Sequence, residues 1–177
     1  DYNMHKYKGN SRRLKLNARG KYIAICEGDD CWTDLYKLQK QVDFLETHPD
    51  YGLIHTELDH YYVKIGKLVK NHWETSNVRE QEGDLYVNFM KGKNSMIYYC
   101  TACYRNDLIN NNADFDKVLQ QNFLIGDTTM SLYISSKSKI GYINESMAVR
   151  NVLLYSMTQG RSFKYNLKLK LDGIRKV

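Results

Sequence analysis

Three carboxylates lie within four consecutive residues of this chain, at Glu27, Asp29 and Asp30, with Gly28 between the first two. Like charges this close repel one another unless a cation or several hydrogen-bond donors compensate them. Mg²⁺ and Mn²⁺ bind carboxylate oxygens, and Mg²⁺ usually takes one or two carboxylates together with substrate phosphates. Gly28 lets the backbone approach a ligand closely. The segment therefore predicts a site for a divalent cation and a phosphorylated ligand; an acidic turn before a helix is the alternative.

The elements around this segment follow from the spacing of the apolar residues. A helix over residues 10–19 ends at Gly20, and the apolar run 21–26 is typical of a short buried strand. The order helix, glycine, strand and acidic loop is typical of an α/β unit, in which ligands gather at the carboxyl ends of strands. The sequence therefore places the three carboxylates at the exit of a strand.

A second helix is expected directly after the acidic segment. Thr33 or Asp34 can cap its start, and Pro49, the single proline of the chain, follows its end near His48. Its apolar stripe is predicted to be Leu38, Val42 and Leu45, with Lys37 and Gln41 outside.

The rest of the chain alternates between predicted strands and helices, without an internal repeat or a second domain. The expected elements are a strand over 51–63, a hairpin return over 67–70 after Gly66, a short helix over 83–90, a strand over 96–104, a helix starting in 105–110, a helix over 130–135 and a strand over 140–149. Residues 163–171 alternate between apolar and polar types, so a strand and a basic amphipathic surface segment are both open.

Two other groups of side chains could bind metal. Cys100 and Cys103 fall in the predicted strand 96–104, where residues three apart point to opposite faces and cannot share one ion, so we expect reduced thiols in an intracellular protein. His55, Glu57 and Asp59 share one face of the strand 51–63. That face could line a cleft or bind metal, and a half-exposed strand explains it equally.

Composition narrows the classes of partner. The formal net charge is +6, with a mild cluster of basic residues over 161–176, which favours phosphates, nucleic acid or an anionic membrane surface. No nucleic-acid-binding motif is present, so we expect no nucleic acid partner. No apolar stretch approaches the roughly 20 residues that span a bilayer. We therefore expect a cytoplasmic protein, with peripheral contact at the inner face of the cell membrane as an option.

The segment 18–34, Ala-Arg-Gly-Lys-Tyr-Ile-Ala-Ile-Cys-Glu-Gly-Asp-Asp-Cys-Trp-Thr-Asp, resembles the core signature of bacterial family 2 glycosyltransferases. Residues 36–45 are similar to the helix that follows it in this family. The resemblance resumes at 94–108, at Gly126-Asp127 and at 141–149. It implies a GT-A fold, an α/β Rossmann-like mixed sheet flanked by helices. Residues 1–150 would be the C-terminal portion of that domain, apparently truncated at its N-terminus, and 151–177 a basic C-terminal extension.

The resemblance also implies an activity. Family members transfer a sugar, with inversion, from a nucleotide-diphosphate donor, here expected to be a UDP-sugar, to a saccharide or lipid-linked acceptor in surface polysaccharide synthesis. Their acidic motif binds Mn²⁺ or Mg²⁺ and the donor, which makes Asp29 and Glu27 the expected metal ligands and Asp30 a donor-binding residue. Asp127 matches the general base that deprotonates the acceptor hydroxyl, and a plain helix N-cap is its alternative role. Trp32 could pack on the donor sugar or anchor the next helix.

The chain departs from the family pattern at several positions. Glu27 stands where Asp is usual, Leu35 where proline is frequent, and the stretch after the strand 141–149 begins with Arg150 and lacks the usual histidine. The opening strand and the acidic residue that reads the nucleobase are not found. The chain could therefore be a fragment of an active hexosyltransferase, or a degenerate, non-catalytic remnant that binds carbohydrate or protein.

Overall fold

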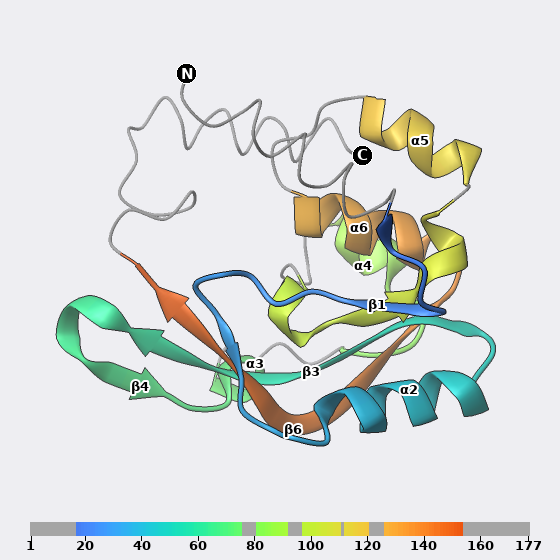
Figure 1. Cartoon of the computed structure of the whole chain (residues 1–177). Helices are drawn as coiled ribbons and strands as arrows, with labels where there is room; N and C mark the ends of the chain where they lie inside the picture. The colour runs from blue at the N-terminus through green and yellow to red at the C-terminus, as the bar shows by residue number, and fades with distance from the viewer. Residues whose placement is uncertain (1–16, 76–80, 92–96, 111, 121–125, 154–177) are drawn as a thin grey trace.

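The computed structural model describes residues 17–75, 81–91, 97–110, 112–120 and 126–153 (Figure 1). Their elements in chain order are β1 (Tyr22–Ala24), β2 (Cys31–Trp32), α2 (Lys37–Thr47), β3 (Tyr51–Tyr62), the 3₁₀ turn η1 (Val63–Ile65), β4 (Lys67–Val69), α3 (His72–Thr75), α4 (Tyr86–Met90), η2 (Tyr99–Thr101), β5 (Cys103–Arg105), η3 (Asn106–Leu108), α5 (Ala113–Gln120), α6 (Gly126–Ser135) and β6 (Lys139–Val152).

The strands form one mixed sheet in the order β1-β5-β3-β6-β2, and β4 pairs with the distal part of β3. The long strands β3 and β6 run parallel, whereas every other pair is antiparallel. Helix α2 lies along one face, and α4 and α6 lie on the other (Figure 1). The expected α/β class, with a mixed sheet flanked by helices, is confirmed.

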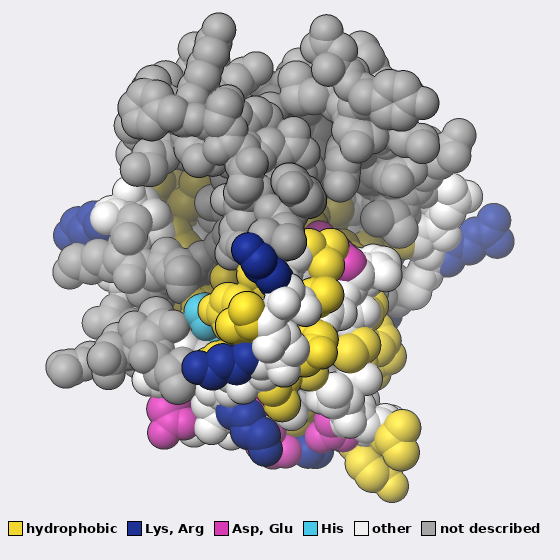
Figure 2. Space-filling model, turned by 90° about the vertical axis from the view of Figure 1, so that its left-hand side faces the viewer, with side chains coloured by type: hydrophobic (Ala, Val, Ile, Leu, Met, Phe, Trp, Pro, Cys, Tyr) yellow, Lys and Arg dark blue, Asp and Glu magenta, His cyan; other side chains and the backbone are white. Residues whose placement is uncertain are grey.

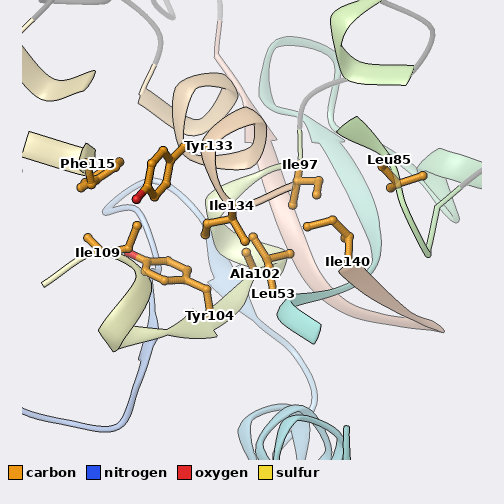
Figure 3. Close-up of a cluster of buried hydrophobic side chains, with 10 residues drawn as sticks. All are labelled: Leu53, Leu85, Ile97, Ala102, Tyr104, Ile109, Phe115, Tyr133, Ile134 and Ile140. Atoms are coloured by element: carbon orange, nitrogen blue, oxygen red, sulfur yellow. The ribbon is translucent and has the colours of Figure 1, made fainter. Parts of the chain in front are cut away.

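Alternation along the strands builds a core on each face of the sheet. Leu53 and Tyr104 face the larger cluster on the α6 side, whereas their neighbours Ile54 and Cys103 face the α2 side. Figure 3 shows Ile134 of α6 lying near Leu53 of β3 and Ala102, the residue just before β5. These two cores hold α2 and α6 at fixed positions relative to the strands.

Most expected elements are present, but several bounds differ. The predicted strand 96–104 is wrong over its middle, because Tyr99–Thr101 forms a 3₁₀ turn and only Cys103–Arg105 is a strand. Cys100 in η2 and Cys103 in β5 therefore do not share one strand, and both are free thiols. Beyond residue 105 the chain forms η3 and then α5. The expected helix over 10–19 lies almost entirely outside the described residues, and the segment 163–171 lies wholly outside them.

Helix α2 buries a different stripe from the predicted one. Lys37, Gln41 and Leu45 are buried, whereas Leu38 is 40% exposed. The Gln41 amide donates to the carbonyl of Thr101 at 2.7 Å and accepts from Lys37 Nζ at 2.8 Å. Gln41 can be buried on this face because it satisfies the backbone carbonyl of Thr101 in η2, which needs a donor.

The start of α2 also differs from the prediction. The helix begins at Lys37, with Tyr36 at the N-cap position and no side-chain cap. Asp34 instead accepts the Tyr36 N–H at 2.6 Å, in the turn before the helix. The short side chain of Asp34 stabilises this turn, and the helix therefore starts later than predicted.

Candidate functional site

The acidic segment forms a tight turn between two edge strands. The Asp30 N–H donates to the Glu27 carbonyl at 3.1 Å, which closes the turn after β1, and β2 follows at once. A Cβ added at Gly28 would meet no atom within 4 Å. The protein itself therefore does not require glycine at this position, and the space beside it is open.

Strand β6 holds this turn from the far end of the chain. Cys31 and Trp32 pair with Val149 and Ala148 of β6. Two residues further along β6, the Asn151 N–H donates to the Asp30 carboxylate at 3.0 Å, and the Asn151 side-chain amide donates to the Asp29 carbonyl. Asp30 thus acts as a structural acceptor, and its own orientation is set by β6.

The carboxylates of Glu27 and Asp127 lie close enough to influence each other, although 100 positions separate them. Burial is the largest cause that raises the pKa of Glu27, to about 7, and the negative charges of Asp127, Asp30 and Asp29 add to it. Arg150 opposes the shift. Glu27 is nevertheless an exposed residue, so its carboxylate is crowded by neighbouring protein atoms without being closed off from solvent. The sequence-predicted metal loop and the predicted base therefore share one acidic corner, formed by Glu27, Asp29, Asp30 and Asp127.

Asp127 lies in the first turn of α6. Its carboxylate accepts the Thr128 N–H at 2.7 Å, and its carbonyl accepts the Ser131 hydroxyl. The helix begins at Gly126, earlier than the predicted start near Met130. A carboxylate in the first turn of a helix is stabilised in its ionised form by the helix dipole.

Two tyrosines lie near the acidic corner. Burial raises the pKa of Tyr99 well above its usual value, and the charges of Asp127 and Glu27 raise it further. Burial also raises the pKa of Tyr98, with Arg150 opposing. The Arg150 guanidinium lies 4.8 Å from the centroid of the Tyr98 ring. The acidic corner is therefore bordered by two phenols and one stacked cation.

Trp32 is engaged in packing. Its indole N–H donates to the Cys100 carbonyl at 2.8 Å, and Lys37 Nζ lies 4.6 Å from its ring centroid. The ring packs against the cluster of Leu58, Trp73, Cys100 and Ala148. These contacts favour the role of Trp32 as an anchor for α2. Packing of the Trp32 ring on a donor sugar stays a prediction.

Glu27 and Asp29 are the carboxylates that fit a divalent cation. Within the described ranges, no three His, Cys, Asp or Glu side chains converge as a ready-made metal site. Two protein carboxylates are nevertheless what Mg²⁺ takes when phosphates complete its shell. The mutual repulsion that raises the pKa of Glu27 is what a cation would relieve.

The group His55, Glu57 and Asp59 is not a half-exposed face, because His55 and Glu57 are buried. The Glu57 carboxylate accepts the N–H groups of Leu58, Trp73 and Glu74 and the Tyr142 hydroxyl, at 2.8 to 3.2 Å. Both of its oxygens accept hydrogen bonds from backbone N–H groups of α3. Glu57 therefore has a structural role, and the predicted half-exposed strand is wrong at this residue.

The residues near the acidic corner that the sequence did not single out are Asn151, Tyr98 and Tyr99, and Cys100 was considered only as a possible zinc ligand. Asn151 and Cys100 both contact Asp30, since the Cys100 thiol also bonds to its carboxylate. No local sequence pattern predicts these two contacts of Asp30, because Cys100 and Asn151 lie about 70 and 120 positions away from it in the chain. The sequence feature that comes nearest to indicating this neighbourhood is Arg150, which directly follows the predicted strand 140–149.

Comparison with known proteins identifies a short shared segment. No protein-family model matches the chain. Uncharacterized proteins of Mycobacterium bovis and Mycobacterium tuberculosis are 64% identical to it over 33 residues. That segment is 19% of this chain and 10% of the length of those relatives. The chain is thus similar to these proteins over a small fraction of their length. Within the described residues, no helix is both long and apolar enough to cross a membrane.

Proposed function

We propose that this chain carries the donor and catalytic side of an inverting glycosyltransferase of the GT-A type. The observation that carries the proposal is that the fold brings Asp127 of α6 near enough to Glu27 for the charge of one carboxylate to act on the other. The sequence resemblance had given these two residues complementary roles, and nothing in their sequence positions required them to be neighbours. The substrate would be a nucleotide-diphosphate sugar, with a saccharide or lipid-linked acceptor, in bacterial surface polysaccharide synthesis.

In this proposal each residue has one task. Asp127 takes the proton from the acceptor hydroxyl as its oxygen bonds to the anomeric carbon, and the bond from that carbon to the diphosphate breaks. Glu27 and Asp29 would hold Mn²⁺ or Mg²⁺, which neutralises charge on the leaving diphosphate. Asp30, held by Asn151, keeps the turn in place. The Asp30 carboxylate thus supports the structure, and the other three carboxylates of the acidic corner are assigned to the reaction.

The test compares Asp29→Ala with Asp127→Asn in the full-length protein. Asp29→Ala should abolish Mn²⁺-dependent UDP binding measured by calorimetry. Asp127→Asn should retain that binding and lose transfer by about 10²- to 10⁴-fold. Asp43→Asn, an exposed carboxylate on α2, serves as the control. Unchanged metal-dependent UDP binding in Asp29→Ala would defeat the metal assignment, and normal turnover in Asp127→Asn would remove Asp127 from the base role.

A non-catalytic carbohydrate- or protein-binding remnant is the second candidate. The engagement of the Trp32 indole with Cys100 and Lys37 favours it, because it removes one surface on which a donor sugar could pack. The two candidates differ in a direct measurement. A remnant would bind saccharide without any response to Mn²⁺ or UDP.

A further inference from the structure

The hairpin that joins β3 to β4 exposes apolar side chains at its tip. Val63 is 46% exposed, Ile65 65% and Leu68 45%. Tyr61 pairs with Leu68 and Tyr62 with Lys67, and Gly66, with a φ of 60°, makes the left-handed turn between the two strands. Figure 1 shows this hairpin extending away from the helices at one end of the sheet. Its apolar side chains are therefore presented outward by regular backbone structure.

Lysines accompany these apolar side chains. Lys64, Lys67 and Lys70 are all exposed, and residues 60–70 contain no Asp or Glu. Within the described residues, no ion pair involves any of the three. Figure 2 shows the face of the molecule on this side, where apolar side chains gather with Lys and Arg among them. The tip thus combines exposed apolar groups with uncompensated positive charge.

We propose that the β3–β4 hairpin tip, residues 63–70, docks on an anionic phospholipid surface. Lysines attract an anionic bilayer surface, and each strengthens binding by about fivefold. The apolar side chains between them would enter the interfacial region, and Tyr61 and Tyr62 stand at the base of the hairpin, as aromatic residues do at membrane interfaces. A protein partner that matched the same tip would have to supply acidic groups for all three lysines.

This proposal goes beyond the transfer reaction and does not depend on it. The hairpin lies at the far end of β3, and none of its residues contributes a carboxylate to the acidic corner. Loss of sugar transfer in Asp127→Asn should therefore leave lipid binding unchanged, and loss of lipid binding should leave Mn²⁺-dependent UDP binding unchanged. The two proposals can fail separately.

The test is co-sedimentation of the protein with vesicles. We expect binding to vesicles that contain phosphatidylcholine and phosphatidylserine, little binding to pure phosphatidylcholine, and weaker binding at high salt. The triple variant Lys64→Gln, Lys67→Gln, Lys70→Gln should weaken binding roughly a hundredfold, the product of three fivefold steps. Lys117→Gln, which removes a positive charge from the exposed surface of α5, is the control and should change little.

Insertion of the hairpin tip into the lipid interface is measured separately. The indole introduced by Ile65→Trp should shift its emission to the blue when anionic vesicles are added, whereas the indole of Leu35→Trp, at a side chain that is 98% exposed, should not. Thermal unfolding shows whether each variant is folded. Three results would overturn the proposal: no binding to anionic vesicles, binding that the triple variant leaves intact, and an emission of the Ile65→Trp variant that vesicles leave unshifted. A change of oligomeric mass in hairpin variants without lipid binding would indicate a second copy of the chain instead.

Discussion

Asn151 on β6 holds the acidic turn at two points, through its backbone N–H to the Asp30 carboxylate at 3.0 Å and through its side chain to the Asp29 carbonyl. The turn is therefore tied to the centre of the sheet, because β6 pairs with the long strand β3. Any ligand at Glu27 and Asp29 would meet a turn whose backbone is already positioned.

Asn151→Ala should weaken Mn²⁺ binding several-fold while lowering the free energy of unfolding by about 1 kcal/mol, the usual worth of one hydrogen bond. Calorimetry and urea unfolding measure the two effects. Asn106→Ala is the control, since the Asn106 amide donates to the Gly20 carbonyl at 2.7 Å and to the Ala18 carbonyl at 3.2 Å, just before β1. It should cost at least as much stability without changing metal affinity. Equal metal affinity in both variants would show that the turn needs no support from β6.

Gly28→Ala should leave stability unchanged or slightly raised, because a Cβ there meets no atom within 4 Å. It should nevertheless weaken UDP binding if the donor approaches this backbone. Gly141→Ala should destabilise the protein by about 1–3 kcal/mol, because its Cβ would lie 2.6 Å from the Phe44 ring of α2. Thermal unfolding compares the two. A large loss of stability in Gly28→Ala would mean that the turn itself requires glycine.

Glu57→Ala should lower the free energy of unfolding by about 3–5 kcal/mol, because it leaves the N–H groups of Trp73 and Glu74 without their acceptor. Glu57→Gln keeps one acceptor oxygen and should cost less. Glu145→Ala removes an exposed partner of Lys40 and should cost under about 1 kcal/mol. Denaturant unfolding of the three variants ranks them. If Glu57→Ala unfolded no more readily than Glu145→Ala, the capping of α3 would be unimportant.

Acid should destabilise the protein through His55. Burial lowers the pKa of His55 to about 4 from its ordinary 6.5, with the Gln81 carbonyl opposing. As the pH falls, His55 binds a proton in the unfolded chain before it does so in the folded protein. The contribution of neutral His55 to the free energy of unfolding is therefore complete above pH 6.5 and is lost as the pH falls toward 4. The loss at a pH of about 4 is roughly 3 kcal/mol.

His55→Gln should flatten that part of the profile of unfolding free energy against pH. His48→Gln, at an exposed histidine just after α2, is the control for the substitution itself. An identical acid sensitivity in wild type and His55→Gln would assign the effect to other groups.

Local patterns in the sequence predicted the α/β class, the strands β1, β3 and β6, the β3–β4 hairpin and the presence of α2. Each depends on apolar spacing, glycine or proline within a few residues, and the sequence alone carries that information. The same patterns placed the acidic segment after a strand, but they started the following helix near Met130, whereas α6 begins at Gly126 and includes Asp127.

Only the tertiary structure decided which groups meet. Gln41 is buried with its amide on the Thr101 carbonyl of η2, and Lys37 is buried with its Nζ on Gln41, whereas periodicity places both outside. Glu57 is a buried acceptor because the start of α3 packs against β3. The neighbours of the acidic turn, Asn151 and Asp127, lie about 100 or more positions away in the chain. Such contacts arise from the pairing of β2 with β6 and the packing of α6 on the sheet, which no local spacing encodes.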